Sequence, residues 1–401
     1  MHDLIVVGAG PAGTMCAREA ALRGLDVLLL DKFELPREKL CGGALSPRVK
    51  TLVDFDISPV VERDVHCAVI HTPSGRRIDI IREDARGYLV KRRNFDYYMT
   101  EKAREAGVDV IDGTKVLSVE QLKTGIRVLS AGDSYKAQLL VGADGVNSIV
   151  ARQVNLRKGW PADRVALCIA ANVPISPSEI DRILTIDEQP GRVSIESYPW
   201  AIDYGYAWCF PKSDEISIGI GYKMGKKVLD LRSAWTKFVE RFEKEKNIKL
   251  EIANRSAQRV PLGKLNQRIT ARRTMLVGDA AGLVSPITGE GLYYAMRSGQ
   301  LAGQVAYETV KTKSPLHVRV YEHRLKQEMN TEFSAANFVS SIAYKSKKKI
   351  ELVCDLAQND PIMQDFMIDL ALGTRSISDI RKDITKRMLR HYPLKALRLL
   401  R

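Results

Sequence analysis

The first thirteen residues constrain the fold more than any other part of the chain. An apolar segment, residues 3–7, runs directly into Gly8, Gly10 and Gly13, which have the spacing G-x-G-x-x-G. In this pattern the first glycine allows a tight turn after a strand, the second leaves room for a pyrophosphate, and the third lets the next helix pack closely. Phosphates favour the N-terminus of that helix because its N–H groups are free. We therefore expect a dinucleotide site.

A helix, a second strand and an acidic residue follow the glycines. Residues 15–23 are predicted to be helical up to Gly24, and residues 26–30 to form a strand that ends at Asp31. A carboxylate about 20 residues past the glycines accepts hydrogen bonds from a ribose and disfavours a 2′-phosphate. This unit fits FAD and NAD equally well. A glycine turn without a ligand is the competing interpretation, and the complete unit disfavours it.

Composition and charge narrow the class of protein. Of the 401 residues 45% are hydrophobic and 27% charged, as in ordinary globular proteins. No uninterrupted apolar run reaches about 18 residues, so we expect no transmembrane helix. The six cysteines lack C-x-x-C spacing, which argues against a metal site or an iron–sulfur cluster and fits a reducing cytoplasm. The net charge of +14 predicts an anionic partner: a lipid surface, a phosphorylated substrate or nucleic acid.

A loop after the first unit contains a cysteine next to two glycines. Residues 36–45 are too irregular for a helix or a strand, and Cys41 is followed there by Gly42 and Gly43. A free cysteine is most often a small buried hydrophobic residue, and from the residues alone we favour that interpretation. The alternative is that Cys41 approaches the ring of the cofactor.

The next residues are predicted to alternate between two sheets. Residues 67–81 read as a strand, a Pro-Ser-Gly turn and a second strand, so we expect an antiparallel hairpin. A helix is predicted to begin at Asn94, its expected N-cap, and to end at Gly107. Strands that rejoin the first sheet are expected at residues 108–111, 117–122, 126–129 and 137–141.

Two later strands end in an Asp next to a Gly. The first leads into Asp144 and Gly145, with Arg152 eight residues after Asp144, and the second ends in Gly278 and Asp279 before a helix of small residues. An Asp at such a place accepts a hydrogen bond from a ribityl hydroxyl, while the helix N-terminus faces the ring or the pyrophosphate. We expect these strand ends to meet the glycine motif at one edge of a sheet.

These three motifs, in this order, resemble the FAD-binding signatures of flavoproteins similar to p-hydroxybenzoate hydroxylase, over about the first 310 residues. Residues 40–43, 206–212, 219–221 and 288–292 resemble the geranylgeranyl reductase family in particular. The resemblance favours FAD over NAD. The cofactor contacts that we expect are Gly8, Gly10, Ala12, Gly13, Asp31, Cys41, Gly42, Ala44, Arg92, Val116, Asp279, Gly291 and Leu292.

Three aromatic residues alternate at period two. As a strand, this segment projects Tyr206, Trp208 and Phe210 from one face of a sheet. From the residues alone an ordinary sheet core explains the row equally well. The resemblance implies instead that the row is the wall of a prenyl-chain cavity. At ~0.8 kcal/mol per buried CH₂, a C20 chain gains on the order of 15 kcal/mol before costs.

The residues after 316 are predicted to be largely helical, with basic segments at 345–349 and 381–401. In the second segment, Met388, Leu389, Tyr392, Leu397 and Leu400 interleave with Arg387, Arg390, Lys395, Arg398 and Arg401. A solvated charged helix and contact with an anionic membrane surface both fit this pattern. Nucleic acid is disfavoured because no recognised binding motif accompanies the charge.

We therefore expect an α/β fold with three parts. These are a Rossmann-like FAD-binding domain (1–65, 94–154 and 272–312), an antiparallel substrate-binding domain (66–93 and 155–271) and a helical C-terminal region (313–401). The resemblance implies an FAD-dependent reductase that saturates double bonds of geranylgeranyl chains in isoprenoid lipids, membrane ether lipids if the source is archaeal. It implies a location in the cytoplasm or on the cytoplasmic membrane face.

Several alternatives stay open. The substrate can be a prenylquinone tail or geranylgeranyl diphosphate, and the same scaffold also supports FAD-dependent aromatic monooxygenases. A quinone-coupled electron-transfer flavoprotein is disfavoured because the chain lacks a cysteine cluster. The chain has no second G-x-G-x-x-G unit for a nicotinamide domain, so the sequence does not identify the electron donor. The two candidates are NAD(P)H that binds transiently and a ferredoxin. Among the residues near the flavin, Cys41 is the candidate proton donor, since a thiol is mostly protonated at neutral pH.

Overall fold

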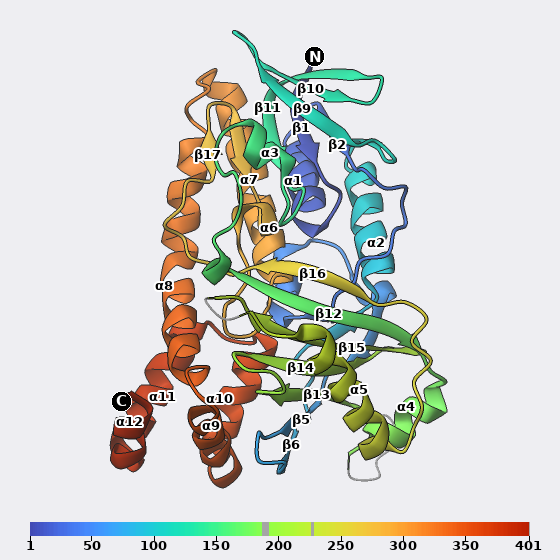
Figure 1. The fold of residues 1–401 in the computed structure, drawn as a ribbon. Helices are drawn as coiled ribbons and strands as arrows, with labels where there is room; N and C mark the ends of the chain where they lie inside the picture. The colour runs from blue at the N-terminus through green and yellow to red at the C-terminus, as the bar shows by residue number, and fades with distance from the viewer. Residues whose placement is uncertain (187–191, 226–227, 401) are drawn as a thin grey trace.

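Two large sheets and a group of helices make up the computed structural model of the chain, which describes residues 1–186, 192–225 and 228–400 (Figure 1). In Figure 1 the first sheet lies above the second, and the long helix α8 (Arg319–Ala343) runs alongside them. The last helices gather at the lower end of α8, next to the second sheet.

The first sheet is parallel at its centre. Its strands, in spatial order, are β17 (Thr270–Ala271), β18 (Thr274–Leu276), β11 (Ser134–Gly142), β1 (His2–Val7), β2 (Val27–Leu30) and β8 (Asp109–Ile111), with β10 (Ile126–Ser130) and β9 (Val116–Gln121) beside β11. β1 pairs in parallel with β2 and with β11. Leu4, Ile5 and Val6 are fully buried, as is typical of parallel strands that are covered on both faces. The predicted parallel unit and the antiparallel meander are confirmed.

α1 (Pro11–Leu22) begins directly after the glycine turn. Gly8 has a φ angle of +109°, which glycine adopts without strain. A side chain at Gly13 would overlap the carbonyl group of Gly8, so this glycine lets α1 lie close to β1. Pro11 occupies the first turn, where its missing N–H leaves no hydrogen bond unmade.

α2 (Arg92–Glu105) begins earlier than the sequence predicts. Its N-cap is Lys91, and Asn94 lies inside the first turn, so the predicted N-cap is wrong. Arg92 forms an ion pair with Asp96 one turn later, and such a pair stabilises the start of a helix.

The second sheet separates a packed core from a large cavity. Its strands, in spatial order, are β16 (Ser256–Pro261), β12 (Val165–Pro174), β15 (Glu215–Lys223), β14 (Gly205–Pro211), β13 (Ser194–Pro199), β5 (Cys67–His71) and β6 (Arg77–Ile81). Neighbouring strands are antiparallel except for β13 and β5, and β5 and β6 form the predicted hairpin. α4 (Pro177–Leu184) and α5 (Leu231–Lys246) pack on one face. A third, small sheet consists of β3 (Ala44–Leu45), β7 (Tyr88–Val90) and β4 (Val61–Asp64), with β7 in the middle.

Of the remaining α-helices, the first follows β11 and the others follow the return of the chain to the first sheet. They are α3 (Ile149–Gln153), α6 (Gly278–Ala281), α7 (Leu292–Thr312), α9 (Lys347–Asn359), α10 (Pro361–Leu372), α11 (Ile377–His391) and α12 (Pro393–Leu400). α9 and α10 bury Ile350, Cys354 and Ile368 in one apolar cluster with residues of β5 and β6. The hydroxyl group of Ser46 donates a hydrogen bond of 2.6 Å to the carbonyl oxygen of Gly373. The N-terminal part and the last helices are thus joined directly.

The predicted helical C-terminal region is confirmed for the residues that the structure describes, and Arg401 lies outside them. None of the helices within the described ranges has both the length and the apolar character that a membrane crossing requires.

Candidate active site

A cavity of about 1680 Å³ extends from the carboxyl edge of the first sheet, across the second sheet, to the last helices. Ligand pockets typically have volumes of about 300–1,000 Å³, so this cavity has room for two ligands at once. Residues of all three motifs predicted to bind the dinucleotide line it, and so does the aromatic row.

The glycine motif forms one end of the cavity. Gly8, Gly10 and Ala12 line it, whereas Gly13 packs against Gly8 beneath the surface. Asp31 follows β2 and also lines the cavity. Its two carboxylate oxygens accept hydrogen bonds from the backbone N–H groups of Ala9 (2.7 Å) and Phe33 (2.9 Å). The backbone thus fixes the carboxylate that faces the expected ribose.

Arg37 is a site residue that the sequence reasoning missed. Its guanidinium group lies 3.8 Å from Asp31 and 3.3 Å from Asp96, and 3.7 Å from where a Cβ atom of Gly10 would lie. Positive charge beside the helix N-terminus is what a pyrophosphate requires. In the sequence Arg37 is one charged residue in an irregular loop, and only the folding of that loop over the glycine turn reveals it.

The two Asp-Gly strand ends lie on the same cavity. One carboxylate oxygen of Asp144 accepts hydrogen bonds from the N–H groups of Ile149 (2.6 Å) and Val150 (3.1 Å), so this residue orients α3. Its other oxygen is buried without a partner among the described residues. Burial raises the pKa of Asp279, and the positive charges of Lys39 and Arg92 oppose this rise. Carboxylate acceptors next to an open volume match the hydroxyl-rich ribityl chain of a flavin dinucleotide.

Arg92 lies between the dinucleotide end and the cysteine loop. It donates two hydrogen bonds of 2.8 Å to Asp96. Burial lowers the pKa of Arg92, but Asp96 and the adjacent Cys41 raise it overall, so the guanidinium group stays charged. Ala44, Val116, Gly291 and Leu292, the other expected cofactor contacts, also line the cavity.

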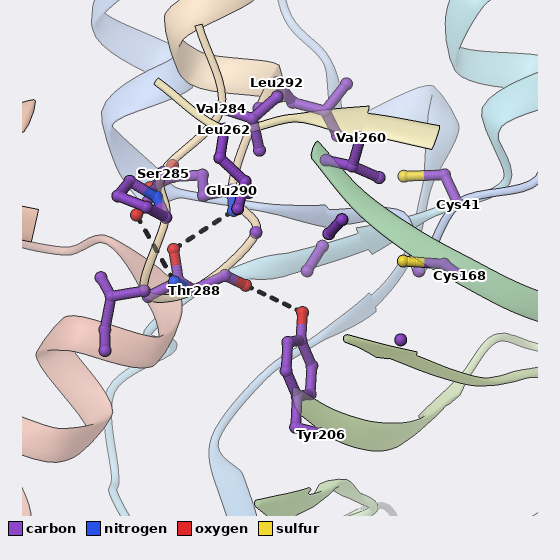
Figure 2. A pocket seen from close by; sticks show the side chains of 18 of the residues that line it. Cys41, Cys168, Tyr206, Val260, Leu262, Val284, Ser285, Thr288, Glu290 and Leu292 are labelled. Carbon is purple, nitrogen blue, oxygen red and sulfur yellow. Dashed lines mark hydrogen bonds between the residues drawn. The ribbon is translucent and has the colours of Figure 1, made fainter. Parts of the chain in front are cut away.

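The loop with Cys41 forms the middle of the cavity wall. Cys41 is partly exposed rather than buried in a core, and its sulfur accepts a hydrogen bond from the N–H group of Gly43 at 3.4 Å. Figure 2 shows the sulfur atoms of Cys41 and Cys168 pointing into the same part of the cavity. Burial raises the pKa of Cys168 to about 12, so that thiol stays protonated. The interpretation of Cys41 as a core residue is wrong.

The aromatic row projects from β14 into the cavity. Tyr206, Trp208 and Phe210 line it, whereas Ala207 and Cys209 face the core under α4 and α5. The hydroxyl group of Tyr206 donates a hydrogen bond of 3.0 Å to the carbonyl oxygen of Thr288 (Figure 2). The indole N–H of Trp208 is buried and has no hydrogen-bond partner among the described residues. The row is therefore a cavity wall and not the interior of a sheet core.

The glycines of residues 219–221 have a packing reason that the sequence alone does not reveal. Gly219 lies opposite Trp208, and Gly221 lies opposite Tyr206, on the neighbouring strand β15. A side chain at Gly219 would overlap the indole ring, and one at Gly221 would overlap the sulfur of Cys168. Gly219 thus leaves space for the indole ring of Trp208, and Gly221 leaves space for the sulfur of Cys168.

The far end of the cavity is mostly apolar and reaches the protein surface. Its lining there comes from α8 to α12 and includes Ile342, Val353, Phe366, Ile384 and Met388. Phe338 and Leu389 line the same end and are 45% and 64% exposed. They therefore form an apolar rim.

A second missed feature is a buried pair of carboxyl groups beside the cavity. Arg48 lies 3.5 Å from Glu290 and 3.1 Å from Glu332, and Tyr294 donates a hydrogen bond of 2.8 Å to Glu332. Burial raises the pKa of Glu290 to about 7, with Arg48 opposing the rise and Glu332 adding to it. Glu290 belongs to the motif at residues 288–292, which the sequence reveals. Arg48 and Glu332 come from segments that are distant in the sequence.

Comparison with known proteins adds to this geometry. Residues 1–324 match the family described as FAD binding domain. Digeranylgeranylglycerophospholipid reductase 1 of Methanococcoides burtonii is 30% identical over 348 residues, which cover 83% of this chain and 81% of that protein. Geranylgeranyl diphosphate reductase of Rhodobacter capsulatus is 29% identical over 408 residues, which cover 99% of this chain and 95% of that protein.

Solved structures share the fold. A geranylgeranyl bacteriochlorophyll reductase-like protein of Thermoplasma acidophilum has a TM-score of 0.80 at 24% identity, and the match covers 99% of this chain and 98% of that one. A halogenase in complex with phloroglucinol and FAD has a TM-score of 0.70 at 16% identity, covering 94% of this chain and 85% of the halogenase. At these identities the likeness concerns the fold alone.

Proposed function

The chain belongs to the FAD binding domain family and, within it, to the geranylgeranyl reductases, and on this basis we propose that it saturates carbon–carbon double bonds of geranylgeranyl chains in isoprenoid lipids. One observation carries the proposal. The cavity with the dinucleotide motifs continues into an apolar compartment behind the aromatic row. A cofactor and a long apolar chain therefore fit in contact with each other.

FAD, when bound and reduced, supplies a hydride to one alkene carbon. The residues that would hold it are those of the glycine motif, Asp31, Arg37 and Asp279. Arg37 would neutralise the pyrophosphate, and the carboxylates of Asp31 and Asp279 would accept hydrogen bonds from the ribose and ribityl hydroxyl groups.

The aromatic row and the helices would hold the lipid chain. Tyr206, Trp208 and Phe210 give a rigid apolar wall, and burial of CH₂ groups stabilises the bound chain by ~0.8 kcal/mol for each group. The same wall excludes water. Reduction therefore takes place where little solvent is present to compete for the hydride.

Cys41 is the residue that we assign as the proton donor. Saturation adds a hydride to one alkene carbon and a proton to the other, and the S–H bond of Cys41 supplies this proton while its electron pair stays on sulfur. The product is the saturated C–C unit, and the thiolate then takes a proton from solvent. A protonated thiol is uncharged, so it can lie in an apolar cavity at little cost.

Mass spectrometry of lipids tests the proposal. Cells that make digeranylgeranyl ether lipids are compared with and without this protein, and cells that accumulate geranylgeranyl diphosphate are compared in parallel. We expect the lipid mass to rise by two hydrogen atoms for each reduced bond. An unchanged lipid with a reduced diphosphate would assign the free diphosphate as substrate, and no change in either would reject the reductase.

We further propose that the apolar rim contacts an anionic membrane surface. Residues 377–400 contain seven lysines and arginines and two aspartates. Leu394 and Leu397 of α12 are 73% and 52% exposed, and Leu389 joins the rim to the cavity. Exposed leucines among basic residues favour an interface of anionic headgroups and acyl chains. A lipid chain can then enter while its headgroup stays at the surface.

Co-sedimentation with vesicles tests this contact. We expect binding to vesicles with anionic lipids, weaker binding at high salt, and a loss for Leu389→Asp combined with Leu394→Asp. Leu22→Asp is the matched control, since Leu22 is exposed at the end of α1. Equal binding of both variants would contradict the proposed surface.

The electron donor is, in our proposal, NAD(P)H or a ferredoxin. Arg152 and Arg259 are exposed at the edge of the cavity and offer positive charge to nucleotide phosphates or to an acidic protein. Anaerobic stopped-flow measurement of flavin bleaching with each donor distinguishes the two. Bleaching that is insensitive to charge reversal at both arginines would exclude this surface.

A further inference from the structure

Lys212 is a buried cation with an unusual set of partners. It directly follows β14 and is 1% exposed. Its ammonium group donates hydrogen bonds to the carbonyl oxygens of Gly42 (2.6 Å) and Phe210 (3.4 Å). Among the described residues no carboxylate forms an ion pair with it. A buried charge without a counter-ion costs stability, so its retention calls for a physical reason.

One peptide group connects Lys212 to the sulfur of Cys41. The carbonyl group of Gly42 and the N–H group of Gly43 belong to the same peptide unit. The carbonyl accepts from Lys212, and the N–H donates to the sulfur of Cys41 at 3.4 Å. A charge on one side of a peptide polarises it and strengthens the hydrogen bond on the other side.

We propose that Lys212 is a positioning residue that holds the cysteine loop and stabilises the Cys41 thiolate through the Gly42–Gly43 peptide. A stronger N–H donor favours the sulfur after its proton has left. This inference rests on the proposed function of Cys41 as proton donor. The connection from Lys212 through the Gly42–Gly43 peptide to the sulfur of Cys41, which we call the relay, does not itself depend on a bound lipid.

The surroundings leave the loop little freedom to adopt another arrangement. A Cβ atom at Gly42 would lie 2.7 Å from the ring of Phe210, and one at Gly43 would overlap the carbonyl group of Val90. Gly43 has a φ angle of +73°, which favours glycine. Ser217 donates a hydrogen bond of 3.3 Å to the carbonyl oxygen of Cys41. The two glycines therefore let the peptide fit between the lysine and the sulfur.

The backbone of Lys212 is fixed as well. Its carbonyl oxygen accepts a hydrogen bond of 2.7 Å from Arg63 of β4. Burial lowers the pKa of Lys212 to about 8, although Cys41, Glu215, Cys209 and Glu62 oppose this. The ammonium form thus predominates at neutral pH, where the relay is needed.

Thiol alkylation of the FAD-loaded protein tests the relay without turnover. Iodoacetamide labelling at neutral pH is followed at Cys41 by peptide mass spectrometry in wild type, Lys212→Met and Lys212→Gln. We expect Lys212→Met to slow labelling about tenfold, the size of one charge-assisted hydrogen bond. Lys212→Gln, whose amide can donate to Gly42 without charge, should be intermediate at about threefold.

Lys246→Met is the matched control. Lys246 is also largely buried, its side chain 9% exposed, but it forms an ion pair with Glu196. We expect wild-type labelling of Cys41 in this variant. Wild-type labelling in Lys212→Met, or equal slowing in Lys246→Met, would overturn the relay. If Lys212→Met does not fold, Lys212→Gln decides alone, because labelling at the wild-type rate would reject a charge effect.

The lipid assay separates this inference from the proposed function. Slow labelling in Lys212→Met together with full lipid reduction by Cys41→Ala would keep the relay and reject Cys41 as proton donor. If the relay exists and Cys41 is the proton donor, Lys212→Met should lower kcat with pre-reduced flavin and leave KM for the lipid unchanged.

Discussion

Trp208 and Gly219 lie opposite each other on β14 and β15, and the six-membered ring of the indole covers the glycine. A Cβ atom on Gly219 would overlap that ring. The position of the cavity wall therefore depends on a missing side chain in the neighbouring strand.

Gly219→Ala should displace Trp208 into the cavity. We expect flavin content to stay at the wild-type level and turnover of the lipid to fall about tenfold or more, because small misplacements of a positioned chain cost large factors in rate. Steady-state assays with quantified flavin provide the measurement. Gly159→Ala is the control, since no atom lies within 4 Å of a Cβ at Gly159. Full activity of Gly219→Ala would show that Trp208 does not shape the chain site.

Trp208→Ala shortens the apolar wall and leaves the dinucleotide motifs intact. We expect KM for a C20 chain to rise about tenfold, and KM for a short prenyl chain to rise less, because fewer CH₂ groups lose contact. The measurement compares KM values for substrates of increasing length. An equal effect on short and long chains would indicate that Trp208 is only part of the sheet packing.

Asp279→Ala should weaken the retention of FAD. The carboxylate of Asp279 lines the cavity and is the expected acceptor for a ribityl hydroxyl group. The loss of a charged hydrogen bond costs about 2 kcal/mol, or roughly 30-fold in affinity. The ratio of flavin to protein after gel filtration measures this loss. Asp279→Asn keeps the shape and one acceptor, so it should lose less. Wild-type retention by Asp279→Ala would remove the residue from the cofactor site.

Cys41→Ser keeps the volume and a donor but is a much weaker acid. We expect both Cys41→Ser and Cys41→Ala to retain FAD. With pre-reduced flavin, their rates of lipid reduction should be lower than the wild-type rate by about tenfold or more. Single-turnover rates isolate this step from flavin reduction. Rates equal to wild type in both variants would mean that water or another group supplies the proton.

Glu290→Gln should change the pH dependence of stability. The pKa of Glu290 is about 7 in the folded protein and lies near 4.3 in the unfolded chain. As pH rises between these values the unfolded chain releases the proton first, so the free energy of unfolding falls by about 3 kcal/mol in wild type. Chemical denaturation across this range should show a smaller fall in Glu290→Gln. The exposed Glu328→Gln should behave like wild type, and parallel curves for all three would contradict the assignment.

Much of the fold follows from local patterns. The glycine spacing, the alternation of Tyr206, Trp208 and Phe210, and the apolar strands each depend on neighbours a few residues apart. These signals predict the parallel unit, the hairpin and the face of the aromatic row. The predicted N-cap of α2 is wrong because the helix already begins at Arg92, before Asn94. An ion pair between Arg92 and Asp96 stabilises this earlier start.

The missed residues depend on segments that are distant in the sequence. Arg37 lies near Gly10 because a loop folds over the glycine turn, and Lys212 reaches Gly42 across 170 residues. Glu290 is paired through Arg48, which comes from the N-terminal part. No periodic pattern in the sequence predicts contacts between such distant residues. The sequence also does not show whether a charged residue in a loop is solvated or buried.

The hydrogen bond from Ser46 to Gly373 bears on the order in which the site is completed during synthesis. On the ribosome, the strands and glycines of the first sheet are made long before α9 to α12. The cofactor end can therefore form while the lipid end is still open to water. Only when Gly373 and the residues after it have emerged can the apolar wall close against the N-terminal part. Until then the nascent chain exposes the apolar lining of the proposed lipid site, and exposed apolar surface makes a folding intermediate prone to aggregation.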